Sequence, residues 1–228
     1  MDVRILAEAD AVAAEAARVI AAEARTAVAA RGRFLMAVSG GRTPWRMLRA
    51  LAGEDVPWSS VHVVQVDERI APAGDPDRNL THLRLSLLEH APLPAEQIHA
   101  MPVEEADLEA AARSYARTLG RIAGTPPVLD LAHLGLGPDG HTASLVPGDP
   151  VLQVVDRDVA LTGVYLKRRR MTLTYPILDR SRRILWVVTG VEKAAMLSRL
   201  IAADASIPAG RVRQERALVL ADREAAKT

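Results

Sequence analysis

The sequence predicts an α/β fold: a single-domain, Rossmann-like three-layer sandwich with a mainly parallel central sheet flanked by helices. Short apolar runs alternate with longer helical patterns along the chain. Polar, glycine-rich clusters follow several of the apolar runs, which is typical of parallel strands that end at one edge of a sheet. No internal repeat, low-complexity tract or linker divides the 228 residues, so we expect residues 1–228 to form one domain.

The first half of the chain begins with a helix predicted over Asp10–Arg31, where apolar residues recur along one stripe between a candidate N-cap and Gly32. Residues 71–79 are rich in Pro, Gly and Asp and are expected to form a surface loop. The remaining elements predicted here are strands at Phe34–Val38, Val61–Val66 and near Gln97–Met101, and helices at Thr43–Ala52, Leu80–Glu89 and Glu104–Ile122.

The second half continues the alternation. A helix is predicted from Gly190 to about Ala203, and strands at Val128–Leu136, Val159–Leu166, Met171–Thr174, Arg183–Thr189 and Ala217–Ala221. Four consecutive cations, Lys167 to Arg170, stand before one of these strands. In a nearly neutral chain they are best explained as one or two anion ligands among solvated neighbours.

The composition limits the core, the partners and the compartment. Hydrophobic residues make up 49% of the chain but aromatic residues only 3%, so Ala, Val, Leu and Ile must build the core. A formal net charge of +1 gives no electrostatic reason to expect nucleic acid or an anionic membrane as partner. The absence of cysteine excludes disulfides, thiolate metal sites and thiol nucleophiles. No stretch resembles a secretory signal or a membrane span, so we expect a soluble, cytoplasmic protein.

Two glycine-rich turns are candidates for a functional site. The first contains Ser39, Gly40, Gly41 and Thr43 and leads into a helix. Exposed backbone N–H groups and a helix N-terminus favour an anion such as phosphate there, although a tight turn that binds nothing is the alternative. The second turn presents His141 beside glycines and an acid, and imidazole titrates near neutral pH. An ordinary turn with polar caps is its alternative.

Six motifs, taken together and in this order, resemble the 6-phosphogluconolactonase family. They are Ser39–Pro44, Val66–Arg69, Arg78-Asn79, Gly135–Ser144, Arg170–Thr174 and Gly190–Lys193. The resemblance implies hydrolysis of 6-phospho-D-glucono-1,5-lactone to 6-phospho-D-gluconate in the oxidative pentose phosphate pathway, without a metal or an organic cofactor. It implies a small-molecule sugar-phosphate lactone as partner, with no nucleic acid and no membrane, and we expect a monomer or weak homodimer. One departure is Arg78, where the family more often has serine.

The resemblance gives His141 the role of general base on water and then general acid to the ring oxygen that leaves. Asp139 either orients the imidazole or only holds the turn. No metal ligand is predicted, because neither a histidine pair at helical spacing nor a thiolate set is present. Of the other histidines, His62 and His133 are expected to be packed within strands, and those at positions 82, 90 and 99 to lie at the surface or at helix ends.

The substrate's phosphate would be held by Ser39, Gly40, Gly41 and Thr43, with Arg170 and Lys193 as opposing charges. Arg42 either contributes to this site or points to solvent. Arg69 could bind either the phosphate or the developing oxyanion, since a guanidinium matches both. Asp67 and Glu68 could accept sugar hydroxyls, but pairing with Arg69 or capping a helix explains each equally well.

Two other functions are weighed against the lactonase. A sugar-phosphate deaminase or isomerase of the same fold is disfavoured, because deaminases follow the Asp-Gly-His stretch with an Asn-Glu pair where this chain has Leu145 and Val146. They also tend to carry tyrosine where this chain has Arg69. A non-catalytic sugar-phosphate sensor is disfavoured, because the single helix before Phe34 leaves no room for a helix-turn-helix.

Overall fold

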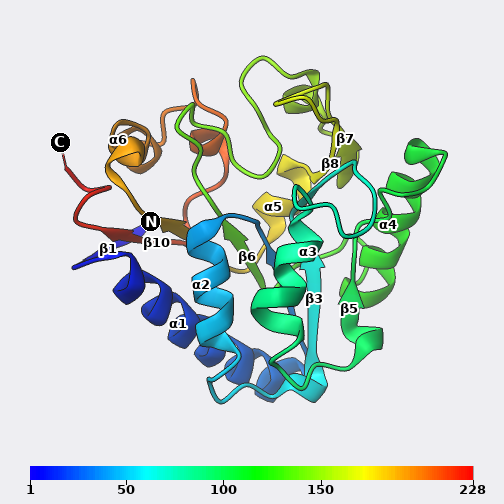
Figure 1. Ribbon diagram of the computed structural model, residues 1–228, viewed down its shortest axis with the longest axis horizontal. Coiled ribbons are helices and arrows are strands. Elements are labelled where there is room, and N and C mark those ends of the chain that lie inside the picture. Colours follow the sequence, from blue (N-terminus) through cyan, green and yellow to red (C-terminus); the bar gives the residue numbers. More distant parts are fainter. Residues whose placement is uncertain (228) are drawn as a thin grey trace.

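A seven-stranded sheet dominates the computed structural model, which describes residues 1–227 (Figure 1). Its strand order is β1-β10-β9-β6-β2-β3-β5, and every neighbouring pair is parallel. The strands are β1 (Asp2–Leu6), β2 (Phe34–Val38), β3 (Val61–Gln65), β5 (Ile98–His99), β6 (Leu131–Leu134), β9 (Ile184–Val188) and β10 (Ala217–Asp222). The predicted α/β class with a mainly parallel central sheet is confirmed.

Helices cover both faces of this sheet, because alternate residues along each strand point into two separate cores. Phe34 and Met36 face the first core, which α1, α2 and α3 cover, whereas Leu35 and Ala37 face the second, which α4, α5 and α6 cover. The helices are α1 (Ala9–Arg31), α2 (Arg42–Leu51), α3 (Asn79–Leu83, continued by a π-helical segment over Arg84–Leu88), α4 (Leu108–Ala123), α5 (Tyr175–Arg180) and α6 (Ala194–Ile201). Within residues 1–227, no helix combines the length and apolar character needed to cross a membrane.

A second, three-stranded antiparallel sheet has the order β4-β8-β7 (Asp67–Arg69, Arg170–Leu173 and Val159–Leu161). The sequence did not predict it. Asp67, Glu68 and Arg69 were expected only to follow a strand, but they form a strand of their own and pair with residues 170–172. β7 and β8 overlap strands predicted over 159–166 and 171–174, whereas β4 was missed because its three residues are too few for hydrophobic periodicity to reveal a strand. In Figure 1, β7 and β8 lie beyond the end at which the β3 arrow points.

Several element boundaries also differ from the expectations. The edge strand β1 was missed, because most of its side chains are exposed or half-buried and it offers no apolar run. The helix expected from Glu104 starts at Leu108, since the Asp107 carboxylate caps it by accepting a hydrogen bond from the Ala110 N–H (2.9 Å). The strand expected over 159–166 ends at Leu161, and α5 was not predicted.

The buried histidines lie largely as expected, with one correction. His133 is fully buried in β6, and His62 lies in β3. His99 was expected at the surface or at a helix end, but it lies half-buried in β5 with its Nε2 3.1 Å from Nδ1 of His62. Burial and the neighbouring His62 and Arg121 lower the pKa of His99 to about 4.

Candidate active site

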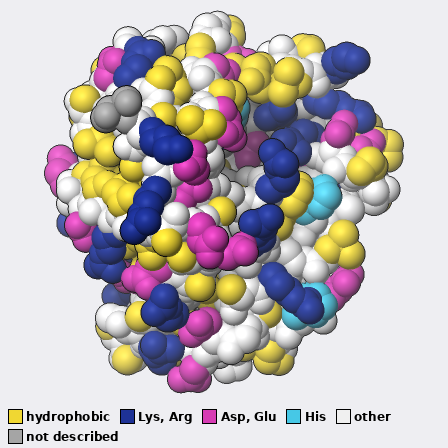
Figure 2. Space-filling view, turned by 60° about the vertical axis from the view of Figure 1, so that its left-hand side comes forward, with side chains coloured by type: hydrophobic (Ala, Val, Ile, Leu, Met, Phe, Trp, Pro, Cys, Tyr) yellow, Lys and Arg dark blue, Asp and Glu magenta, His cyan; other side chains and the backbone are white. Residues whose placement is uncertain are grey.

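A cavity of about 490 Å³ lies at the carboxyl ends of the parallel strands, where ligands bind in open α/β sheets. Segments that follow β2, β6 and β9 line it together with residues of the small antiparallel sheet. Figure 2 shows a hollow on this face beside a column of Lys and Arg side chains. The residues that we singled out in the sequence and that line this one cavity are Ser39, Gly40, Gly41, Arg42, Thr43, Asp67, Arg69, His141, Arg170 and Lys193.

The turn after β2 is tied to the neighbouring strand β6. The Ser39 N–H donates to Nδ1 of His133 (3.2 Å), and its hydroxyl donates to the His133 carbonyl (3.0 Å). Burial lowers the pKa of His133 to about 3, so the ring is neutral and Nδ1 is free to accept. The N–H groups of Gly40 and Gly41 have no acceptor within the described part of the chain. They remain available to an anion in front of helix α2.

Gly40 is required by a close approach. A Cβ atom at this position would lie 2.0 Å from Oδ1 of Asn79, whose side chain packs against the turn. That Oδ1 is buried and has no hydrogen-bond partner among residues 1–227, while Nδ2 donates to the Asp67 carbonyl (3.0 Å). Asn79 therefore lines the cavity, although sequence reasoning placed it only in a motif and assigned it no role.

Lys193 reaches the cavity from a short 3₁₀ segment, Val191–Lys193, that begins directly after Gly190. The Gly190 N–H donates to both carboxylate oxygens of Asp222 at the end of β10 (3.1 and 3.2 Å). Burial lowers the pKa of Lys193, and the Arg42 charge lowers it further, whereas Glu192 and Asp139 act in the opposite direction. The hydroxyls of Thr43 and Thr189 lie 2.5 Å apart and join this segment to the turn after β2.

His141 is held by Asp139 in the turn after β6. Oδ1 of Asp139 lies 2.5 Å from Nδ1 of His141 and also accepts the His141 backbone N–H (3.1 Å). Because an ionised carboxylate only accepts hydrogen bonds, Nδ1 must carry a proton, and in the neutral form of the ring the lone pair is then on Nε2. A Cβ at Gly137 would lie 2.1 Å from Nδ1 of His141, so this pair requires glycine behind it. Asp139 itself does not line the cavity.

The pKa of Asp139 is lowered even though burial alone would raise it. The opposing contributions come from the His141 charge, the backbone and side-chain hydrogen bonds of His141, and the Tyr165 hydroxyl. That hydroxyl donates to Oδ2 of Asp139 (3.1 Å). Sequence reasoning gave Tyr165 no role, because nothing in the local pattern shows that residues 162–169 fold back onto the turn after β6.

Arg170 enters the cavity from the antiparallel sheet with little solvent contact. Its Nε is buried without a hydrogen-bond partner in the described structure, and its Nη1 lies 3.5 Å from the Ser144 hydroxyl. Burial lowers the pKa of Arg170, and nearby Arg69 adds to this, while Asp67 opposes it. A buried guanidinium with an unused donor suits an anionic ligand.

Asp67 and Arg69 lie in β4 and do not pair with one another. The Asp67 carboxylate accepts from the Ser144 hydroxyl (2.6 Å) and from Nδ2 of Asn79 (3.3 Å). Arg69 donates through Nη1 to the Asp77 carbonyl (2.5 Å), and its Nε is buried without a partner among the described residues. Both side chains reach the cavity wall.

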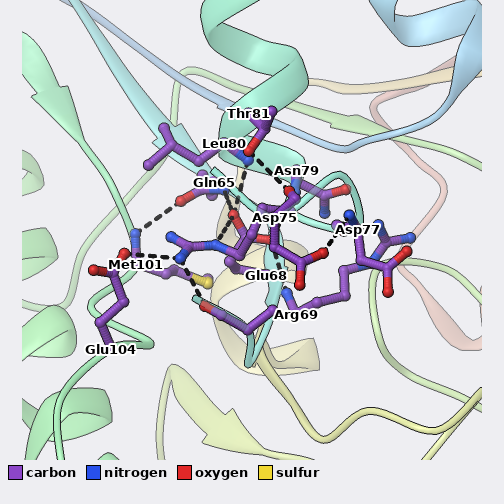
Figure 3. Close-up of polar contacts among 12 residues, drawn as sticks. Gln65, Glu68, Arg69, Asp75, Asp77, Asn79, Leu80, Thr81, Met101 and Glu104 are labelled. Atoms are coloured by element: carbon purple, nitrogen blue, oxygen red, sulfur yellow. Dashed lines mark hydrogen bonds and ion pairs between the residues drawn. The ribbon is translucent and has the colours of Figure 1, made fainter. Parts of the chain in front are cut away.

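Glu68 does not line the cavity, and its carboxylate caps helix α3 (Figure 3). Its fully buried carboxylate accepts from the backbone N–H groups of Asn79 (2.7 Å) and Leu80 (2.8 Å). Arg78 lies beside it, with Nε 3.2 Å from Oε2, and also binds Glu104 (2.8 Å) and the Ala71 carbonyl (2.9 Å). Of the roles left open for Glu68, the structure therefore selects helix capping, and Arg78 neutralises its charge.

Residues 1–227 contain no group of three His, Cys, Asp or Glu side chains that could hold a metal ion. Leu145 and Val146 are buried in the apolar core region, where they contribute no titratable group to the cavity.

Comparisons with known proteins agree with the geometry. The family model described as "Glucosamine-6-phosphate isomerases/6-phosphogluconolactonase" matches residues 7–220. A Mycobacterium tuberculosis protein named 6-phosphogluconolactonase is 37% identical over 98% of this chain and 96% of its own length. A Synechocystis protein of the same name is 39% identical over 75% of this chain and 72% of its own length. The crystal structure of a Thermotoga maritima 6-phosphogluconolactonase superposes with a TM-score of 0.85 at 27% identity, covering 97% of this chain and 98% of the other.

Proposed function

Since the chain belongs to the glucosamine-6-phosphate isomerase/6-phosphogluconolactonase family, we propose that it hydrolyses 6-phospho-D-glucono-1,5-lactone to 6-phospho-D-gluconate. The observation that carries the proposal is the pairing of His141 with Asp139 at a cavity that also holds an anion-binding turn. A hydrolytic group and a phosphate site in one cavity suit a phosphorylated lactone. This activity would place the protein in the oxidative pentose phosphate pathway.

In the proposed mechanism, Nε2 of His141 removes a proton from water as the water oxygen attacks the lactone carbonyl carbon. The tetrahedral intermediate then collapses, the bond to the ring oxygen breaks, and protonated His141 returns the proton to that oxygen. The new carboxylic acid loses its proton to solvent. Asp139 keeps Nδ1 protonated throughout, which supports an orienting role for it as well as its role in the turn.

We propose that the substrate's phosphate binds in front of helix α2. The N–H groups of Gly40 and Gly41, which have no acceptor within residues 1–227, would surround the phosphate oxygens together with the Thr43 hydroxyl. The Ser39 hydroxyl would join them by turning from the His133 carbonyl to the phosphate. Lys193 and Arg170 would supply the opposing positive charges. Both are partly removed from water, which strengthens their attraction for a dianion.

Arg69 and Asp67 have proposed roles at the lactone ring. Arg69 is assigned either to the phosphate or to the oxyanion, and the two assignments predict different kinetic effects when Arg69 is removed. Loss of the phosphate contact raises KM, whereas loss of an oxyanion contact lowers kcat. The oxygens of Asp67 each accept one hydrogen bond in the structure, which leaves lone pairs for a sugar hydroxyl.

The deaminase alternative is disfavoured by the same site. Ring opening and proton transfer need a titratable group, but the positions after the catalytic turn hold the buried aliphatic residues Leu145 and Val146.

The proposed reaction needs neither a metal nor an organic cofactor, so treatment with a chelator is expected to leave turnover unchanged. We also propose a cytoplasmic monomer or weak homodimer, which light scattering can distinguish.

A coupled assay tests the proposed function. Freshly generated 6-phosphogluconolactone is supplied to the protein, and 6-phosphogluconate dehydrogenase reports the product as it forms. We expect product formation well above the spontaneous hydrolysis of the lactone, and no release of ammonia from glucosamine 6-phosphate. A rate equal to spontaneous hydrolysis would exclude the lactonase, and ammonia release would favour the deaminase.

A further inference from the structure

We propose that Tyr165 is a positioning residue that holds the Asp139 carboxylate and, through it, fixes the orientation and tautomer of His141. This inference rests on the proposed function, in which the lone pair on Nε2 of His141 activates water. Tyr165 lies in the loop of the β7–β8 hairpin, far from the catalytic turn in sequence. Its hydroxyl donates to Oδ2 of Asp139 over 3.1 Å.

The two oxygens of the Asp139 carboxylate accept hydrogen bonds from two different residues. Oδ1 receives the His141 ring and backbone N–H groups, whereas Oδ2 receives the Tyr165 hydroxyl. With both oxygens engaged, the carboxylate has little freedom to rotate away from the imidazole. The Tyr165 ring also meets the His141 ring edge to face, with centroids 5.6 Å apart at an interplanar angle of 66°. Tyr165 thus contacts both members of the pair.

The hairpin is built to hold Tyr165 in this place. Leu166 and Lys167, at its tip, both have left-handed backbone conformations, with φ values of 48° and 68°. Non-glycine residues adopt that region at a cost in stability, so the surrounding contacts must enforce it. Reciprocal backbone hydrogen bonds between Tyr165 and Arg168 (2.9 and 3.2 Å) close the tip.

The far side of the hairpin is anchored as well. The Arg168 guanidinium lies 3.1 Å from the carboxylate of Asp75 and 3.2 Å from that of Asp77, both in the loop before α3. On the cavity side, the Arg170 guanidinium lies 5.0 Å from the centre of the Tyr165 ring. Tyr165 therefore contacts the turn after β6 and Arg170, while Arg168 ties the hairpin that carries Tyr165 to the loop before α3.

Tyr165 acts through Asp139 and does not itself touch the substrate. The cavity wall contains His141 and Arg170 but not Tyr165. Burial and the neighbouring Asp139 raise the pKa of Tyr165, so its hydroxyl stays protonated and serves as a donor. Removal of this hydroxyl should consequently lower kcat and leave KM almost unchanged.

The experiment compares Tyr165→Phe, which removes only the hydroxyl, with Tyr175→Phe as a matched control. The Tyr175 hydroxyl is also hydrogen-bonded, to the Pro208 carbonyl (2.9 Å), but it does not contact Asp139. Two quantities are measured: the kinetic constants for lactone hydrolysis, and the tautomer of His141 in the free enzyme from the NMR shifts of its ring nitrogens. Thermal melts confirm that both variants are folded.

We expect Tyr165→Phe to lower kcat about tenfold with KM within about twofold, because one hydrogen bond to a charged group is lost. His141 should change from the Nδ1-protonated tautomer to a mixture of both, while Tyr175→Phe matches the unaltered protein in both measurements. An unchanged kcat, or a lower kcat with an unchanged tautomer, would overturn the inference. The NMR measurement does not need turnover, so it decides the role of Tyr165 even if the unaltered protein proves not to hydrolyse the lactone.

Discussion

Two turns line the cavity, and they present different chemical groups to it. The turn containing Ser39 and Thr43 follows β2, and it offers mainly backbone N–H groups and the start of a helix. The turn containing His141 follows the neighbouring strand β6, and it depends on side chains: Asp139 beside it and Tyr165 from a distant hairpin. The geometry of the turn after β2 is set by a few consecutive residues. The geometry of the turn after β6 also depends on a side chain that only folding brings to it.

This difference has a physical consequence for how each turn responds to mutation. A phosphate shared among several backbone donors and cations loses only part of its binding when one side chain is removed. A proton relay loses its function when its single titratable group is removed. Substitutions at the two turns should therefore differ both in size and in the kinetic constant that they change.

The largest expected effect is that of His141→Ala, which removes the proposed base. We expect kcat for 6-phosphogluconolactone to fall by about 10² to 10⁴-fold, with the binding of 6-phosphogluconate largely intact. The coupled assay, corrected for spontaneous hydrolysis, measures the loss, and calorimetry measures product binding. Turnover near that of the unaltered protein would remove His141 from the mechanism.

A second substitution tests the side-chain network behind the site. Arg78→Ala leaves the fully buried Glu68 carboxylate without its cation, so we expect the free energy of unfolding to fall by about 3 to 5 kcal/mol. Urea denaturation measures this change. Arg18→Ala serves as control, because the ion pair of Arg18 with Glu15 is largely solvent-exposed on the arginine side and should matter little. Equal midpoints for both variants would show that the Arg78 pair does not stabilise the fold.

The substitutions Lys193→Ala and Arg170→Ala test the proposed contacts of these two cations with the substrate's phosphate. Loss of one charge-assisted contact should raise KM for the phosphorylated lactone by about 10 to 100-fold. The same variants should hydrolyse unphosphorylated gluconolactone as the unaltered protein does. Lys167→Ala is the matched control, because Lys167 is an exposed member of the same run of cations as Arg170. This variant should leave KM for the phosphorylated lactone and the hydrolysis of the unphosphorylated lactone unchanged. An equal loss on both lactones would contradict the phosphate assignment.

The smallest effect concerns pH and Lys193. In the proposed site, the charged form of the Lys193 ammonium binds the phosphate, and burial lowers the pKa of Lys193. The affinity for phosphate is therefore full at neutral pH and falls as the pH rises through this pKa, which happens at a lower pH than for an ordinary lysine. We therefore expect the Kd for 6-phosphogluconate to rise on the alkaline side of neutral, at a lower pH than an ordinary lysine would give. In Lys193→Arg the rise should disappear, since arginine stays charged. A rise of the same size in both proteins would place the titrating group elsewhere.

The contrast between the turns also explains what the sequence revealed. The alternation of strands and helices, the glycine turn before α2 and the Asp-Gly-His stretch are local signals, and each predicted its element or turn. The antiparallel sheet was invisible, because β4 has three residues and pairs with a strand about a hundred positions away. Tyr165 was not singled out, and Asn79 was placed in a motif without a role, for the same reason: their contacts join segments that no short window of sequence contains.

The position of β10 constrains how the chain can fold during its own synthesis. This strand lies between β1 and β9, so β1 has no partner in the main sheet until the last strand has been made. Asp222 at its end also fixes Gly190, and with it the segment that carries Lys193. A nascent chain that still lacks β10 therefore has an open gap in its sheet and lacks the Asp222 contact that holds the start of the segment carrying Lys193.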